Sequence, residues 1–181
     1  PQAIFIEGGF VTLDQLAHDL GIVRAGEKIW RNPEDLPRLR ELIPPGEPLA
    51  LFGPGPVWLY AALAAHVAPA PFHLFDARYF GWMLPPPVVY PSPQANAEFT
   101  LTADLTADPI RLVFTRQEAH YLLKPLPVHV PPLPPERAVV LDGPMPNWLW
   151  AALAQALRQH PSLAAFDPRQ SAAITFWTAN A

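Results

Sequence analysis

Two Asp-x-Arg triplets contain the residues best suited to phosphate chemistry. The first pairs Asp76 with Arg78, and the second pairs Asp167 with Arg169. A guanidinium can hold two phosphate oxygens and stabilise the charge that develops when a phosphodiester breaks. A nearby carboxylate can deprotonate or orient a ribose 2′-hydroxyl, or hold a metal ion. We predict catalytic roles for these four residues; the open alternative is an Asp–Arg pair that only braces a turn.

Five further residues are candidates for ligand binding. Gly53, Gly55 and Gly143 stand where a strand leads into a helix, and free amides together with the positive helix end favour phosphate there. A tight structural turn is the other interpretation. Tyr79 directly follows the first triplet and could meet a base, while His73 alternates along the preceding strand and could reach a ligand.

The triplets end two related segments, Leu49–Arg78 and Ala138–Arg169. Each segment runs strand, Gly-Pro loop, Trp-Leu helix, short apolar strand and Asp-x-Arg. The copies are offset by about half the chain, and solenoids usually need at least three shorter units. The pattern therefore predicts two related halves that form an intramolecular pseudo-dimer.

Periodicity places the elements of each copy. Short apolar runs predict strands at 49–52, 72–75, 138–141 and 163–166. Apolar residues at helical spacing predict helices that begin near Trp58 and Trp148, with both tryptophans in the core, and that end before Pro69 and Pro161. A strand–helix–strand unit implies a right-handed crossover and parallel strands.

The flanking regions are predicted less regularly. We expect strands at 3–7, 99–103, 111–115 and 174–177, and short helices at 12–20, capped by Thr12, and at 33–42. Residues 125–135 are rich in proline and predict an edge segment or an ordered loop. The domain prediction is a divergent half at 1–90, a stiff proline-rich linker at 91–98 and a second half at 99–181.

Composition bounds the class of protein. The chain has 181 residues, 50% of them hydrophobic and 15% charged, which indicates a globular protein. The alternating predicted strands and helices make its class α/β. A net charge of −4 argues against binding long nucleic acid, which needs a basic surface. Cysteine is absent, so a disulfide framework and a thiolate nucleophile are excluded. No apolar run reaches the roughly 18 residues that span a bilayer, so we expect a cytoplasmic protein without a membrane partner.

One run carries a family resemblance. The residues from Ala138, A-V-V-L-x-G-P-x-P-x-W-L-x-A-A-L through F-D-P-R, follow a strand pair and a proline-containing segment. This arrangement resembles the CRISPR-associated ring nucleases and deadenylases, which have a small CARF-like α/β fold and also occur fused to ATPase domains. The likeness is best over 99–181, and the first copy matches over 49–78.

The resemblance implies both a fold and an activity. The fold would be two CARF-like or ferredoxin-like β-α-β halves paired within one chain. The ligand would be cyclic oligoadenylate, with the tetra-adenylate as the expected ring, and the activity would be opening that ring to end type III CRISPR signalling. A homodimer of the tandem chain is a further expectation.

Histidine is where this chain departs from the family. The resembling deadenylases carry two helical histidines four residues apart and another after the last strand, which form a manganese site with an aspartate. The matched positions here are Ala65, Pro69, Gln155, Gln159 and the vicinity of Thr178. We therefore expect no cofactor and no metal ligands, with manganese as the open alternative, and a route in which the substrate's own 2′-hydroxyl attacks.

Two other functions stay open. The missing histidines favour a non-catalytic sensor or sponge that binds the same ligand and regulates a CRISPR effector. A repeat with a purely architectural role is the third possibility.

Overall fold

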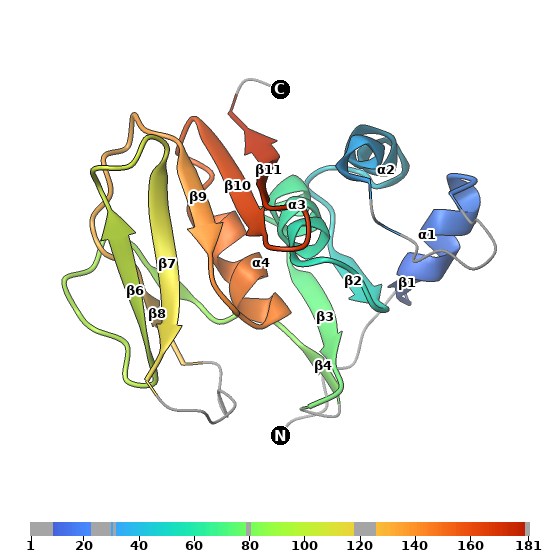
Figure 1. Cartoon of the computed structure of the whole chain (residues 1–181). Coiled ribbons are helices and arrows are strands. Elements are labelled where there is room, and N and C mark those ends of the chain that lie inside the picture. Colours follow the sequence, from blue (N-terminus) through green and yellow to red (C-terminus); the bar gives the residue numbers. More distant parts are fainter. Residues whose placement is uncertain (1–8, 23–29, 31, 79–80, 118–125, 180–181) are drawn as a thin grey trace.

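The computed structural model describes residues 9–22, 30, 32–78, 81–117 and 126–179, and they form a mixed α/β fold (Figure 1). The first sheet has the order β1 (Val11–Thr12), β2 (Leu49–Phe52), β3 (Phe72–Asp76), β4 (Gly81–Met83). The second has the order β11 (Ala172–Thr178), β10 (Ser162–Asp167), β9 (Val139–Asp142), β7 (Ile110–Arg116), β6 (Phe99–Asp104). A small third sheet pairs β5 (Val88–Val89) with β8 (Val128–His129).

Four α-helices accompany the sheets in the described residues: α1 (Leu13–Asp19), α2 (Leu36–Leu42), α3 (Val57–Val67) and α4 (Asn147–Ala156). A short 3-10 turn, η1 (Pro33–Asp35), leads into α2. Thr12 caps α1 as predicted, because its hydroxyl accepts a hydrogen bond of 3.0 Å from the Gln15 amide. None of the described helices is long and apolar enough to cross a membrane.

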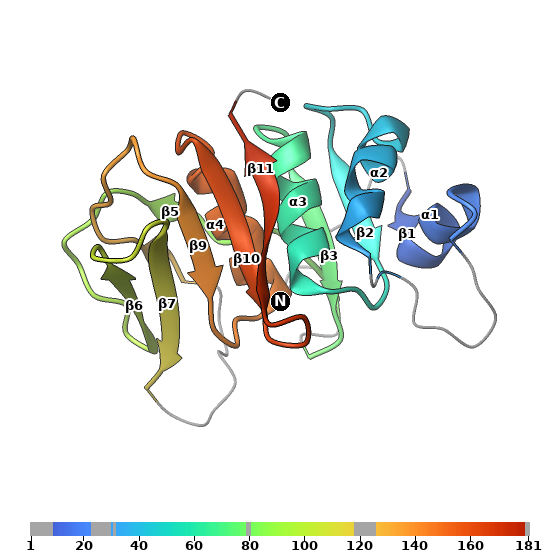
Figure 2. The same cartoon turned by 45° about the horizontal axis from the view of Figure 1, so that its top comes forward.

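Both strand–helix–strand units form as predicted. Strand β2 pairs with β3 in parallel, and β9 pairs with β10 in parallel, so each helix serves as the crossover. In both units the strand after the Asp-x-Arg triplet turns back antiparallel, as β4 against β3 and β11 against β10. Figure 2 shows the second unit with its longer strands beside α3 of the first.

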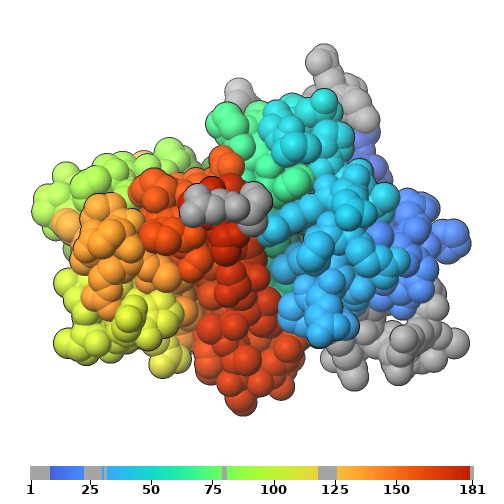
Figure 3. Space-filling view, turned by 90° about the horizontal axis from the view of Figure 1, so that it is seen from above, coloured from blue at the N-terminus to red at the C-terminus, as the bar shows by residue number. Residues whose placement is uncertain are grey.

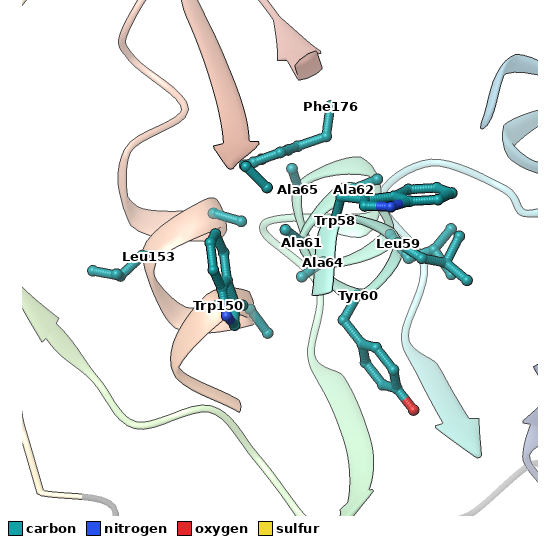
Figure 4. Packing of buried hydrophobic residues seen from close by; sticks show 14 of the residues in the cluster. Trp58, Leu59, Tyr60, Ala61, Ala62, Ala64, Ala65, Trp150, Leu153 and Phe176 are labelled. Atoms are coloured by element: carbon teal, nitrogen blue, oxygen red, sulfur yellow. The ribbon is translucent and has the colours of Figure 1, made fainter. Parts of the chain in front are cut away.

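The two crossover helices lie between the two large sheets and pack against each other (Figure 1). Alanines make the approach close, and Figure 4 shows Ala61 and Ala64 on the side of α3 that faces Trp150. The Gln155 amide donates to the Ala64 carbonyl at 3.2 Å, and Arg158 donates to the Ala68 carbonyl at 2.8 Å. The core is therefore continuous from one unit into the other.

The N-terminal region, which has no repeat counterpart in the sequence, completes the first sheet. Strand β1 pairs in parallel with β2, just as β7 pairs in parallel with β9. Val11 stands opposite Leu51, and Leu112 stands opposite the equivalent Leu141. Strand β1 thus takes the position in the first sheet that β7 takes in the second. The predicted strand at 3–7 lies outside the described residues.

Helix α2 reaches across to the C-terminal strand. The Arg40 guanidinium donates to the Phe176 carbonyl of β11. In Figure 3 the light blue surface of α2 lies directly against the red surface of β11. Helix α2 is therefore in contact with β11, although the two are far apart along the chain.

The proline-rich segment at 91–98 is anchored along β8 and the residue that follows it. The Ser92 amide donates to the Val130 carbonyl at 2.8 Å. The Asn96 side chain both donates to the His129 carbonyl and accepts from the His129 amide, each at 2.8 Å. Ser92 and Asn96 are buried, so this segment packs against β8 and Val130.

Candidate functional site

Each Asp-x-Arg triplet folds into the same compact corner at the end of a central strand. In the second copy, the Arg169 Nε donates to Asp167 Oδ1 at 3.1 Å and Nη2 donates to Oδ2 at 3.1 Å. The Arg169 amide also donates to Oδ1 at 2.9 Å. In the first copy Arg78 makes the same three hydrogen bonds to Asp76, two of them at 2.9 Å. The sequence repeat is thus a repeat of one side-chain geometry.

Burial divides each pair into an inner carboxylate and an outer guanidinium. The exposed side-chain fraction is 6% for Asp76 and 3% for Asp167, against 42% for Arg78 and 67% for Arg169. An aspartate held in this way fixes the plane of the guanidinium. The arrangement therefore presents an oriented cation to solvent.

The aspartates are poor proton acceptors in this state. Burial alone would raise the pKa of Asp167, but hydrogen bonds from the Arg169 side chain and amide, together with the Arg169 charge, outweigh it and lower the pKa below its usual value. The pKa of Asp76 is lowered by the same balance of burial and Arg78. Each carboxylate can thus orient its arginine but is a weak general base.

The first turn of α3 supplies a side chain to each corner. Trp58 is buried, and its indole N–H lies beside Asp167 and helps to lower that pKa, although its geometry falls short of a hydrogen bond. Two residues on, the Tyr60 hydroxyl donates to the Gly53 carbonyl. Burial and then the negative charge of Asp76 raise the pKa of Tyr60 to about 12. Helix α3 therefore places Trp58 beside Asp167 and brings Tyr60 within range of the Asp76 charge.

Sequence reasoning placed Trp58 in the core, which the structure confirms, but missed its approach to Asp167. Trp58 and Trp148 occupy equivalent positions in the two segments. The sequence does not reveal which residues lie beside each tryptophan in the folded chain. The sequence pattern offers no prediction for Tyr60, whose hydroxyl donates to the Gly53 carbonyl.

The three glycines are accounted for by close packing. Gly143 has a φ of +112°, and a Cβ there would lie 2.5 Å from the Phe114 carbonyl oxygen of β7. Gly53 has a φ of +130°, and a Cβ would lie 3.1 Å from the Cβ of Leu13. At Gly55 it would lie 2.7 Å from a Leu13 methyl group. Packing thus supports the structural-turn interpretation, and phosphate binding at these loops stays a prediction.

The remaining candidates are placed as follows. His73 is half-buried on β3, and burial lowers the pKa of its imidazole, which favours the neutral form. Its register places it beside Ala50, on the face of the sheet opposite the buried Asp76. Tyr79 lies outside the described residues.

The two histidines near the helix ends form hydrogen bonds within the fold. His66 Nε2 lies 2.7 Å from the Ile43 carbonyl oxygen. His160 is fully buried between the Tyr90 hydroxyl and the Arg137 carbonyl, each 3.0 Å from a ring nitrogen. Within the part of the chain that the structure describes, no three histidine, aspartate or glutamate side chains are grouped closely enough to hold a metal ion.

A shallow cavity of about 230 Å³ lies beside the anchored proline-rich segment. Asn96, His129 and Trp148 are among the residues that line it. The sequence did not predict this cavity, because its walls come from residues that are far apart along the chain. Neither Asp–Arg corner lines it.

Comparison with known proteins gives one match. Residues 119–179 match the family model described as CRISPR-associated protein (Cas_csx3). This stretch covers about a third of the chain and includes β8, β9, α4, β10, the second Asp–Arg corner and β11. The match supports a CRISPR-associated protein. No curated protein and no solved structure matches the chain.

Proposed function

We propose that this protein binds a cyclic oligoadenylate, with cyclic tetra-adenylate as the expected ring, and opens it to end CRISPR signalling. The observation that carries the proposal is the duplicated corner: a buried aspartate holding an oriented, solvent-facing arginine at the end of β3 and again at the end of β10. The family match over the second corner supports it. A ring of repeated phosphates suits a chain with two related cation sites.

In this proposal Arg78 and Arg169 contact phosphates, while Asp76 and Asp167 are positioning residues. Holding the guanidinium plane prepares it for bidentate contact with a phosphate and for the charge that builds up in the transition state. Because both aspartates have lowered pKa values, we assign them no proton transfer. This revises the sequence-based prediction that they act as acid or base.

The proposed reaction uses a nucleophile from the substrate. The ribose 2′-oxygen attacks the adjacent phosphorus, the bond from phosphorus to the 5′-oxygen breaks, and a 2′,3′-cyclic phosphate and a 5′-hydroxyl result. The 2′ proton passes to solvent and the 5′-oxygen takes one from solvent. The protein contributes alignment of the 2′-oxygen with the breaking bond and stabilisation of the phosphorane charge.

The alternative is a sensor or sponge that binds the same ring without cleaving it. The observation that favours it is that each corner carboxylate is engaged by its own arginine. A corner of this kind binds anions well but has no group at hand to remove the 2′ proton.

The test incubates the purified protein with labelled cyclic tetra-adenylate and cyclic hexa-adenylate, each with EDTA or with manganese, and resolves products while a shift assay reports binding. We expect linear products that persist in EDTA. Binding without products would establish the sensor, and no binding of either ring would overturn both functions.

Matched variants locate the site. Arg169→Met and Arg78→Met should each weaken ring binding about tenfold or more, the effect of losing one charge-assisted phosphate contact. Arg38→Met is the control, because Arg38 is also a half-exposed arginine paired with an aspartate, but it lies on α2, away from the ends of β3 and β10 (Figure 1). Equal loss in all three variants would indicate a general charge effect and contradict the proposed site.

A further inference from the structure

The cavity beside the proline-rich segment has aromatic walls and a small set of polar side chains. Residues 95–99, Leu126, Pro127, His129 and Trp148 line it. Its volume of about 230 Å³ is below the roughly 300–1,000 Å³ of pockets that take drug-sized ligands. The cavity therefore suits one flat ring system rather than an extended molecule.

His129 is held in this cavity by two buried side chains. Asn96 fixes the main chain, because its side chain donates to the His129 carbonyl and accepts from the His129 amide, each at 2.8 Å. Ser92 fixes the ring, because its Oγ lies 2.9 Å from His129 Nδ1. Ser92 is 4% exposed and Asn96 is 9% exposed. A bond at one ring nitrogen sets the orientation and the tautomer of the other, which is how histidines at functional sites are prepared.

The surroundings of Ser92 place the ring proton of His129. Ser92 Oγ already accepts a hydrogen bond of 3.2 Å from the Gln94 amide. Its own proton is buried and needs an acceptor, which His129 Nδ1 supplies. The neutral imidazole then carries its proton on Nε2. Among the residues that the structure describes, Nε2 has no hydrogen-bond partner, so the cavity contains an N–H that is ready to donate.

A hydrogen-bond acceptor lines the same cavity. Glu98 is exposed, and its carboxylate can accept from a ligand. Phe99 and Trp148 offer apolar ring surface, which favours a flat aromatic ligand. The ligand that fits is an aromatic ring with an acceptor and a donor side by side on one edge. Adenine has this edge, because its amino group lies next to a ring nitrogen that carries a lone pair.

Topology puts the cavity on the same edge of the second sheet as the Asp167–Arg169 corner. Strands β7, β9 and β10 are parallel, so their carboxyl ends share that edge (Figure 1). Phe99 begins β6 opposite Arg116, the last residue of β7. The cavity is thus on the side of the sheet where Arg169 contacts phosphate in the proposed function.

The first copy lacks the strand that forms this wall. The second sheet ends at β6, whereas in the described residues the first sheet ends at β1, in the position of β7. No described strand takes the place of β6 there. The cavity therefore belongs to the second half alone, unlike the duplicated corners.

We propose that this cavity binds one adenine base, with His129 Nε2 donating to a ring nitrogen and Glu98 accepting from the amino group. Ser92 and Asn96 are positioning residues for His129. The choice of adenine among the bases rests on the proposed function. An adenine of the ring and the adenine of a free nucleotide have the same chemistry at this site.

The test titrates the full chain with adenosine and follows saturation transfer to the base protons by NMR. Adenosine carries no phosphate, so its binding does not report on the arginine corners. We expect a Kd of roughly 0.1–1 mM, which is ordinary for a ligand of this size. Inosine has the same shape but an oxygen acceptor and a ring N–H on this edge. It should bind about tenfold more weakly, because both hydrogen bonds are then mismatched.

Two variants locate the site. Ala97 is exposed and lines the cavity, so Ala97→Trp should obstruct it and weaken adenosine binding at least tenfold. Ala173→Trp, at an exposed position on β11, is the matched control and should leave binding unchanged. Glu98→Met should remove most of the preference for adenosine over inosine, and it tests the site even if Ala97→Trp does not fold. Circular dichroism checks the fold of each variant.

Binding of cyclic tetra-adenylate to the same variants separates the two sources of adenine. Weaker ring binding by Ala97→Trp assigns the cavity to a base of the ring, and unchanged ring binding assigns it to a free nucleotide. The proposal is overturned if adenosine does not bind at about 10 mM, if inosine binds equally well, or if Ala97→Trp binds adenosine normally. Failure of the proposed function is seen separately, as no ring binding by the natural protein.

Discussion

At the residue scale, the aspartate of each corner fixes the orientation of its arginine. A half-exposed arginine on a surface samples many orientations, and its ion pairs contribute little. A carboxylate that is almost fully buried and accepts three hydrogen bonds restricts the guanidinium to one plane. The cost of burying the charge is offset only while the pair stays intact.

Acid should therefore reduce the stability that the Asp167–Arg169 pair contributes to the fold. The folded-state pKa of Asp167 lies below its ordinary value, so its contribution to stability is complete above about pH 4 and is lost as the pH falls through the folded-state pKa. We expect Asp167→Asn to lower the free energy of unfolding by about 1–2 kcal/mol at pH 7 and by less at pH 3. Urea unfolding at pH 7, 5 and 3 measures both. A difference that stays constant with pH would contradict the pairing.

The indole of Trp58 should act on Asp167 across the two copies. Trp58→Phe removes the N–H that helps to lower the pKa of Asp167, so that pKa should rise. Trp148→Phe is the matched control, because Trp148 is equally buried at the equivalent position and its N–H has no described partner. Carboxyl chemical shifts followed by NMR as a function of pH report the difference. An equal shift in both variants would rule out the specific contact.

At the element scale, the loops between strand and helix are shaped by the strand beside them. Gly143 lies against the Phe114 carbonyl, and Gly53 lies against Leu13 at the start of α1. Strand β7 beside Gly143, and the start of α1 beside Gly53, approach these loops so closely that a side chain has no room. The Gly-Pro pattern seen in the sequence is thus explained by packing within each sheet.

Gly143→Ala should be more damaging than a glycine substitution in open space. The new methyl group would meet a backbone oxygen at 2.5 Å, and the φ of +112° is one that alanine rarely adopts. We expect a loss of about 2–3 kcal/mol in the free energy of unfolding. Gly46→Ala, with a φ of +73° and no atom within 4 Å of the new methyl, should lose about 1 kcal/mol. Similar losses in urea unfolding would contradict the close approach.

At the scale of the whole molecule, contact between α3 and α4 makes the two units one core. The small side chains on α3 allow a close helix pair, and Phe176 of β11 lies over the same helix (Figure 4). The side chains of Gln155 and Arg158 cross the junction to backbone carbonyls of the first copy. Separate folding of the halves would leave these surfaces exposed.

Ala64→Leu should therefore destabilise the whole chain in one step. The larger side chain has no space between the helices, and overpacking of this kind costs about 1–3 kcal/mol. We expect a single cooperative transition shifted to lower urea, with fluorescence and circular dichroism coinciding. Ala173→Leu at an exposed strand position is the control. Two separated transitions would show that the units unfold independently.

The sequence by itself determined much of the local structure. Apolar periodicity placed β2, β3, β9, β10 and β11 to within two residues, and Thr12 marked the start of α1, because these signals come from neighbours along the chain. The two Asp-x-Arg corners could be recognised in the sequence because each aspartate and its arginine are only two residues apart.

Only the tertiary structure decided which residues meet across the repeat. The position of β1, the approach of Trp58 to Asp167 and the anchoring of Asn96 on β8 all join residues more than 30 positions apart. Such contacts form because the apolar surfaces of distant segments are buried together in one core. A local pattern of side chains does not determine which segments meet.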